Sequence, residues 1–251
     1  MLKSRKVAQK YTAQITVNEN EIPVEIVLEP RNGTRYSITR KRIILRMPGS
    51  ASSLHIQEEL GRLREWVRQV ALKRPAALQH FVEKQYVTGQ VLTVGNRTYQ
   101  LDVKAEDRSA HSGRLKGTFI EIRLSNKASP VQQKKAVQTL LSRVIAGDFY
   151  EEVAQRVRDI NQRTFQKPFK NVFLKHNHSN WGSCSSNGNI NLSTRLLFAP
   201  VPVQEYVILH ELAHLIEMNH SDRFWNLISQ YMPDYSSKEK WLKDHGNSCN
   251  F

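Results

Sequence analysis

The amino-acid sequence predicts an α+β protein in which a β-rich region precedes a mostly helical one. Apolar and polar residues alternate over residues 22–28, which is the period of a half-buried strand. Apolar residues recur at three- and four-residue steps over residues 130–161, which is the period of an amphipathic helix. A further helical segment, near residue 210, is apolar on nearly all sides and contains two histidines four positions apart.

The β-rich front is expected to span residues 1–125 and to include one long helix. The segment Arg31-Asn32-Gly33-Thr34 predicts a turn into a strand over residues 36–46. Apolar residues at helical spacing predict a helix over residues 52–84, which Pro75 should end or kink. No internal repeat is recognised in the sequence. The remaining expected elements of this region are strands at 91–94, 98–103 and 118–124 and a polar loop at 106–117.

The helical region is expected to span residues 126–251. Ser129-Pro130 is a typical pair of N-cap and first-turn residues, so the long amphipathic helix should begin there. Pro200 and Pro202 precede the histidine-bearing helix, which is expected over residues 203–218. The remaining expected elements are short strands at 169–174 and 189–193 and short helices at 221–232 and 237–244.

The sequence His210-Glu211-Leu212-Ala213-His214 is the strongest functional motif of the chain. Residues four apart share one face of a helix, so both imidazoles can bind one cation. Neutral imidazole is a preferred ligand of Zn²⁺, and a catalytic zinc keeps one position for water, beside which Glu211 would act as general base. The alternative, a surface helix that carries two histidines, conflicts with the apolar residues around the motif. We therefore expect one zinc ion per chain.

A third ligand is expected at His220, ten residues after the first histidine. Extended H-E-x-x-H-x-x-G-x-x-H sites use this spacing, and their glycine turns the chain back toward the metal. Here Glu217 replaces the glycine, so a turn at Met218-Asn219, with the asparagine in a left-handed conformation, would have to form instead. Glu217 lies on the His214 face of the helix and is the competing third ligand. Otherwise Glu217 would orient an imidazole or be solvated.

Composition limits the location and the partners of the protein. Two cysteines, Cys184 and Cys249, are too few for a disulfide framework, so a cytoplasmic location is expected. The basic N-terminus lacks the features of a secretory signal. No apolar stretch approaches the roughly 18 residues of a membrane span, so no membrane partner is expected.

The net charge of +14 is the second functional signal. Such a surface attracts nucleic acid without reading its sequence. The favoured interpretation is nevertheless a basic surface that serves solubility, because no cations interleaved with aromatic residues identify a binding groove. The cations that would form a nucleic-acid face belong to the front region and are Arg40, Lys41, Arg42, Arg62, Arg64 and Arg68.

The segment 181–197 precedes the histidine helix and predicts a hairpin, whose exposed edge would pair with an extended substrate. Cys184 in this segment would need a partner such as His176 or His178 to act as a nucleophile. We favour the simpler interpretation, in which Trp181 and Cys184 are buried apolar residues and both histidines are solvated.

Four further motifs accompany the histidine motif: Trp181-Gly182-Ser183-Cys184-Ser185, Gly188-Asn189-Ile190-Asn191-Leu192, Asn219-His220-Ser221 and Phe224-Trp225. Together they resemble the YgjP-like metallopeptidase family, which is related to the SprT-like zincins. The resemblance is strong over residues 130–245 and looser in the front region. It implies a zincin-like core, with an active-site helix beside a small sheet, and a zinc-dependent peptidase. It also implies His210, His214 and His220 as ligands and Glu211 as base.

Two positions depart from the family pattern. Asn180 stands where a basic residue is usual, and Ser193 stands where asparagine is usual. Neither is expected to touch the metal, but both would alter contacts with a peptide or protein substrate.

Three classes of function follow from the sequence. The leading hypothesis is hydrolysis of peptide bonds by zinc-activated water, with Glu211 as general base. The second is a SprT-like protease that acts on nucleic-acid-bound proteins, which salt-dependent duplex binding would distinguish. The third is a non-catalytic binding module with a structural zinc. The presence of Glu211 argues against this third class, because a structural site needs no base.

Overall fold

The computed structural model confirms the α+β class and the β-rich N-terminal region. It describes residues 8–17, 20–39, 42–74, 77–78, 81, 84, 86–177 and 179–251. The chain forms two compact units, which divide between Glu83 and Lys84 and have separate hydrophobic cores. Within the described ranges, no helix is both long enough and apolar enough to cross a bilayer.

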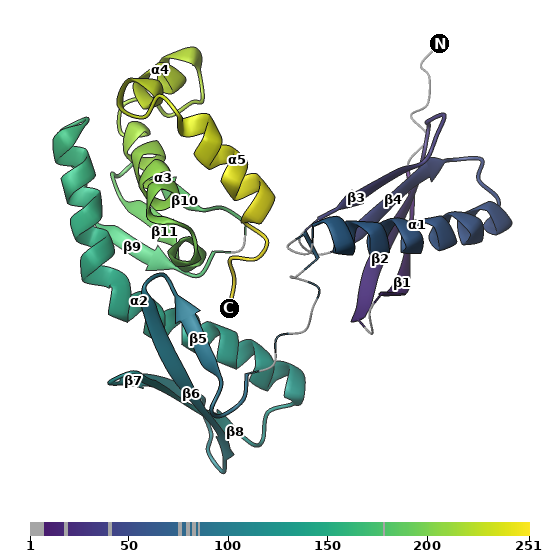
Figure 1. Cartoon of the computed structure of the whole chain (residues 1–251), viewed down its shortest axis with the longest axis horizontal. Helices are drawn as coiled ribbons and strands as arrows, with labels where there is room; N and C mark the ends of the chain where they lie inside the picture. The colour runs from purple at the N-terminus through teal and green to yellow at the C-terminus, as the bar shows by residue number, and fades with distance from the viewer. Residues whose placement is uncertain are drawn as a thin grey trace. The chain divides into compact units, whose positions relative to one another are not determined.

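The first unit is a four-stranded sheet with one helix packed on it (Figure 1). The strand order is β1-β2-β4-β3, and the two central strands are parallel. Leu63 and Val67 of the helix are fully buried in one core with Leu45 of β4. The elements are β1 (Gln9–Val17), β2 (Asn20–Glu29), β3 (Arg35–Ile38), β4 (Ile43–Pro48) and α1 (Ser53–Lys73).

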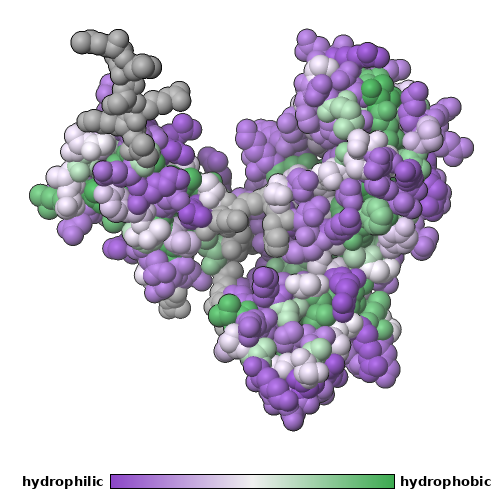
Figure 2. Space-filling model, turned by 180° about the vertical axis from the view of Figure 1, so that it is seen from behind, coloured by the Kyte–Doolittle hydropathy of each residue, from purple (hydrophilic) through white to green (hydrophobic). Residues whose placement is uncertain are grey.

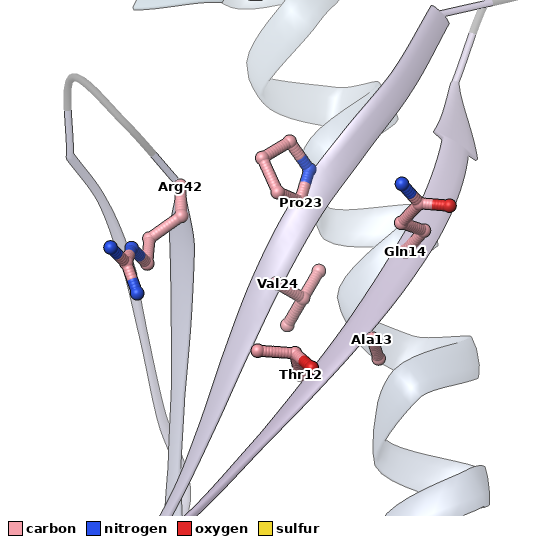
Figure 3. A pocket seen from close by; sticks show the side chains of 6 residues that line it. All are labelled: Thr12, Ala13, Gln14, Pro23, Val24 and Arg42. Atoms are coloured by element: carbon pink, nitrogen blue, oxygen red, sulfur yellow. The ribbon is translucent and has the colours of Figure 1, made fainter.

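A pocket lies on this sheet and is lined by Thr12, Ala13, Gln14, Pro23, Val24 and Arg42 (Figure 3). Thr12 and Gln14 alternate along β1 with the core residue Ile15, so their side chains lie on the face away from α1. Arg42 is already paired with Glu25. The lining residues include no histidine, cysteine or carboxylate, so this pocket has no counterpart to the histidine motif.

The second unit begins with another four-stranded sheet and helix. The strand order is β5-β6-β8-β7, and the two central strands are again parallel. The helix has 34 residues, against 21 in α1, and its additional length packs on the rest of the unit. The elements are β5 (Val91–Val94), β6 (Arg97–Glu106), β7 (Ser112–Lys116), β8 (Phe119–Ser125) and α2 (Pro130–Arg163).

These two modules correspond residue for residue at a constant separation of 77 positions. Both helices begin after a serine N-cap, Ser52 in the first module and Ser129 in the second. The corresponding register pairs are Val17–Asn20 and Val94–Arg97, Val24–Ile43 and Leu101–Ile120, and Arg35–Arg46 and Ser112–Arg123. The chain therefore contains a tandem β-β-β-β-α repeat.

Side-chain interactions repeat with the same separation. A glutamate at the end of the second strand of each module pairs with two arginines, and Leu63 and Leu140 are buried at equivalent helix positions. The ion pairs are Glu29–Arg31 and Glu29–Arg46 in the first module, and Glu106–Arg108 and Glu106–Arg123 in the second. The expectation of no internal repeat is therefore wrong. The modules share core positions and a few polar pairs, while most other residues differ.

The remainder of the second unit surrounds one central helix with a small sheet and two further helices (Figure 1). The sheet order is β10-β11-β9, and its edge strand β10 lies against α3. This arrangement confirms the expected helix beside a small sheet. The elements are β9 (Val172–Lys175), β10 (Gly182–Cys184), β11 (Ile190–Ser193), the 3₁₀ helix η3 (Thr194–Phe198), α3 (Val201–Ala213), α4 (Asp222–Tyr231) and α5 (Tyr235–His245).

Several expected elements differ from the observed ones. The helix expected over 52–84 ends at Lys73, and Pro75 lies outside the described residues. The polar segment 106–117 contains the edge strand β7, which needs few apolar residues because β8 alone pairs with it. Strand β1 was not expected. Strands β10 and β11 pair antiparallel and form the expected hairpin before the histidine helix. The histidine helix ends at Ala213 rather than near 218.

The observed division of the chain also differs from the expected boundary at 125/126. Ile120 and Ile122 of β8 are fully buried in the same core as Leu141 and Ile145 of α2. The second sheet therefore belongs to the same unit as the helical region, and the first module forms the other unit.

The repeat supplies a matched pair of core substitutions. Leu63→Ala and Leu140→Ala each remove a buried leucine at equivalent positions, and each should cost about 2–5 kcal/mol of stability. Because the cores are separate, Leu63→Ala should reduce amide protection in β4 and leave β8 unchanged, and Leu140→Ala should do the reverse. Hydrogen exchange at increasing denaturant measures both. Equal loss of protection in both modules from either variant would contradict separate cores.

Candidate metal centre and active site

Helix α3 carries the histidine motif and is buried on most of its surface. Val207, Ile208, Leu209 and Leu212 are at most 3% exposed, so the helix is fixed by core packing. His210 is half-buried near its C-terminal end, and His214 is the C-cap residue. The two imidazoles therefore emerge together from a rigid support.

The structure brings His210, His214 and His220 together. One nitrogen from each imidazole lies within 4.8 Å of the other two, as in a metal-binding cluster. The Nε2 atoms of His210 and His220 are 3.0 Å apart. Ring centroids are 4.8–5.0 Å apart in all three pairs. The spacing of ten residues thus brings the third histidine to the first two.

Glu217 is turned away from this cluster. Its backbone carbonyl accepts a hydrogen bond of 3.0 Å from Nδ1 of His214, which leaves Nε2 of that imidazole unprotonated. Its side-chain oxygen accepts from the Asn219 amide at 3.4 Å. The expected left-handed turn is absent, because Gln166 is the one non-glycine residue with positive φ in the described part of the chain. The geometry therefore favours His220 over Glu217 as third ligand.

Glu211 is 5% exposed and faces strand β10. The Cys184 amide donates a hydrogen bond to it, and burial raises the pKa of Glu211 to about 8 despite this bond. A Cβ atom built on Gly182 would lie 2.6 Å from both Cγ and Oε1 of Glu211. Only glycine therefore leaves room for the carboxylate. The sequence predicts the hairpin that contains β10 but does not reveal this contact between Gly182 and Glu211.

Burial favours the neutral imidazole at His210 and His214. It is the main cause that lowers the pKa of His210 to about 3, and the neighbouring His214 and His220 lower this pKa further. Burial also lowers the pKa of His214. Neutral imidazole is the form that binds a metal, so these two side chains are suited to act as ligands.

Cys184 has no arrangement suited to nucleophilic catalysis. Burial, and then the charge of Glu211, raise the pKa of its thiol, which disfavours the reactive thiolate. Nδ1 of His176 lies 3.3 Å from the Thr194 hydroxyl, and His178 lies outside the described residues. Cys184 contributes its backbone amide to the site instead.

The two positions that depart from the family pattern and two tyrosines of the C-terminal helices differ in their relation to the site. Ser193 is fully buried and donates from Oγ to the Asn177 carbonyl, so it cannot contact a substrate, whereas Asn180 is exposed. Tyr231 donates to the Thr164 carbonyl and packs edge-on against Phe165. Tyr235 lies closer, because its ring stacks on aromatic residues that contact the cluster.

Three of the six cations expected to form a nucleic-acid face are paired with carboxylates. Arg42 pairs with Glu25, Arg62 with Glu59 and Arg68 with Glu65. The remaining cations of the expected nucleic-acid face are Arg64, which is exposed, and Arg40 and Lys41, which lie outside the described residues. Figure 2 shows a mostly hydrophilic surface. These pairings favour a solvated basic surface.

Comparison with known proteins now assigns the chain to a family. The model of the YgjP-like metallopeptidase domain matches residues 34–245, which include part of the first unit, most of the second and the whole histidine cluster. The chain belongs to the YgjP-like metallopeptidase family. A metal-dependent peptidase is therefore its general activity, and the implied metal has a matching set of donors in the histidine cluster. No curated protein matches the chain significantly.

Two solved structures are similar to part of this YgjP-like chain. The metallopeptidase zymogen abylysin of Pyrococcus abyssi is 24% identical, with a TM-score of 0.31, over 37% of this chain and 91% of its own. The metallopeptidase zymogen jannalysin of Methanocaldococcus jannaschii is 23% identical, with a TM-score of 0.33, over 36% of this chain and 91% of its own.

The contact between Gly182 and Glu211 generates a prediction for this peptidase. Gly182→Ala should displace the Glu211 carboxylate while the three imidazoles stay in place. Metal content should be unchanged, and peptide hydrolysis should fall about 100-fold, as for a catalytic group misplaced by about 1 Å. Ser183→Ala in the same strand is the matched control and should retain activity. Full activity of Gly182→Ala would show that this contact does not position Glu211.

Proposed function

We propose that this YgjP-like metallopeptidase is a zinc enzyme in which His210, His214 and His220 hold the metal and Glu211 is the general base. The convergence of three imidazole nitrogens within 4.8 Å carries this proposal. Glu211 follows the first ligand directly and is held against β10, so the chain supplies a base next to the ligand set. The expected substrate is a peptide or a protein.

The donor set fits zinc. Three neutral imidazoles leave a fourth, open position, which is the composition of catalytic zinc sites. Two nitrogens bound to one tetrahedral zinc at about 2.0–2.1 Å lie about 3.4 Å apart. The observed separations run from 3.0 Å to at most 4.8 Å, so small movements would complete the site. The His214–Glu217 hydrogen bond fixes the tautomer that presents Nε2.

The chemistry divides between the metal and the protein. Zinc, when bound, supplies a Lewis acid that lowers the pKa of water and polarises the peptide carbonyl. Glu211 accepts a proton from the attacking water and then delivers it to the leaving amine, so its charge is restored after each turnover. A backbone amide of strand β10 donates a hydrogen bond to this carboxylate. Because β10 is the edge of its sheet, it also offers main-chain groups to an extended substrate.

Two other functions find less support. A non-catalytic zinc module would not need a buried carboxylate beside the ligands. Glu211 nevertheless lies there, and its position requires a glycine in β10. A protease acting on nucleic-acid-bound proteins would need a free cationic face, whereas the described cations of the first unit are mostly paired.

Replacing the general base tests the mechanism. Glu211→Gln keeps the size of the side chain but cannot accept a proton. The variant should bind zinc as tightly as the native protein, while peptide hydrolysis should fall by about two to four orders of magnitude. Unchanged turnover at full zinc occupancy would exclude Glu211 as the base.

The ligand assignment is tested by a second pair of variants. His220→Ala removes a nitrogen from the cluster, so zinc affinity should fall steeply. Glu217→Ala removes a side chain that points elsewhere and keeps the carbonyl that binds His214, so affinity should be nearly unchanged. Zinc competition with a calibrated chelator measures both. The opposite order of affinities would show that Glu217 is the third ligand.

A further inference from the structure

The histidine cluster rests on one buried aromatic ring. Phe224, on α4, is fully buried, and its centroid lies 4.6 Å from that of His214 and 4.8 Å from those of His210 and His220. Its ring is nearly parallel to the His214 ring, with an interplanar angle of 29°. All three imidazoles therefore share one apolar neighbour.

A second ring, Trp225, connects the exposed histidine to α5. Trp225 lies 5.8 Å from His220 at an interplanar angle of 32°, and it stacks on Tyr235 at 5.3 Å and 16°. Tyr235 in turn stacks on Tyr206 at 6.3 Å, and Tyr206 lies 6.0 Å from His210. These contacts form a closed circuit of rings that joins α3, α4 and α5 around the cluster.

Hydrogen bonds do not explain how His220 is held. His214 has the Glu217 carbonyl as partner, as is usual for a metal-binding imidazole. Among the described residues, His210 and His220 have no hydrogen-bond partner besides each other. His220 is also exposed and lies in a non-helical segment. Its ring orientation must therefore come from packing.

The local sequence explains how the rings reach the cluster. Ser221, directly after His220, is the N-cap of α4 and accepts a hydrogen bond from the Phe224 amide at 3.4 Å. Because the helix begins directly after this cap, Phe224 and Trp225 lie in its first turn and pack against His220. The sequence His220-Ser221-x-x-Phe224-Trp225 is thus one structural element.

We propose that Trp225 is a positioning residue, which orients the His220 imidazole for metal binding by ring packing instead of a hydrogen bond, with Tyr235 as its support. This inference rests on the proposed zinc site. Trp225 need not contact metal or substrate in this role. Its effect should appear in metal affinity and depend on the presence of His220.

Zinc affinity of full-length variants, measured by chelator competition, tests the proposal. Trp225→Leu should weaken zinc binding about 10- to 100-fold, the usual effect of losing a group that orients a ligand. Trp225→Phe keeps an aromatic ring and should recover most of the affinity. Tyr235→Leu, which removes the support, should cause a smaller loss than Trp225→Leu. Trp241→Leu is the matched control, since Trp241 stacks on His245 and not on the cluster, and its affinity should equal that of the native protein.

A double-mutant cycle separates positioning from general stability. In the His220→Ala background, Trp225→Leu should cause a much smaller loss of zinc affinity, because the third imidazole is gone and only the 6.0 Å contact of Trp225 with His210 remains. An equal loss in both backgrounds would indicate a merely structural role and overturn the proposal, as would native affinity in folded Trp225→Leu. Failure of the native protein to bind zinc would instead refute the proposed function.

Discussion

Three imidazole nitrogens within 4.8 Å of one another are the constraint on which the second unit depends. Lone pairs that face each other repel unless a proton or a cation lies between them, so packing must hold the rings together. Helix α3 provides two of them from a buried support, and α4 brings Phe224 beneath all three. Burial lowers the pKa of His210 and raises that of Glu211.

Glu211 is fixed by a different contact from the three histidines. Glu211 lies where α3 meets the edge strand β10, and the missing side chain of Gly182 leaves room for its carboxylate. The histidines depend on α4, whereas Glu211 depends on a three-residue strand. Metal binding and proton transfer can therefore be disturbed separately, which makes their contributions measurable.

Much of this site could be predicted from sequence, because residues four positions apart, such as His210 and His214, lie on the same face of a helix. His220 was predicted by its distance from the first histidine. The contact with Gly182 could not be predicted, since three residues are too few to show the alternation of a strand. The role of Glu217 was also hidden, because its backbone rather than its side chain orients His214.

The fold class could be predicted from the periodicity of apolar residues, but its repeated construction could not. The two β-β-β-β-α modules share buried positions such as Leu63 and Leu140 and capping serines at 52 and 129, separated by many unrelated residues. Only strand pairing makes their correspondence visible. In the second module, α2 is extended and its added residues pack against the sheet and helix that carry the site. The first module ends with the shorter helix α1 and keeps a core of its own.

The central claim is that one zinc ion held by the three histidines is required for peptide hydrolysis. The most direct test measures zinc content and hydrolysis of a broad peptide library on the same full-length sample, before chelation, after chelation and after zinc is restored. The account predicts about one zinc per chain, loss of hydrolysis with the metal and its recovery with zinc. Hydrolysis that persists after complete removal of the metal would contradict it.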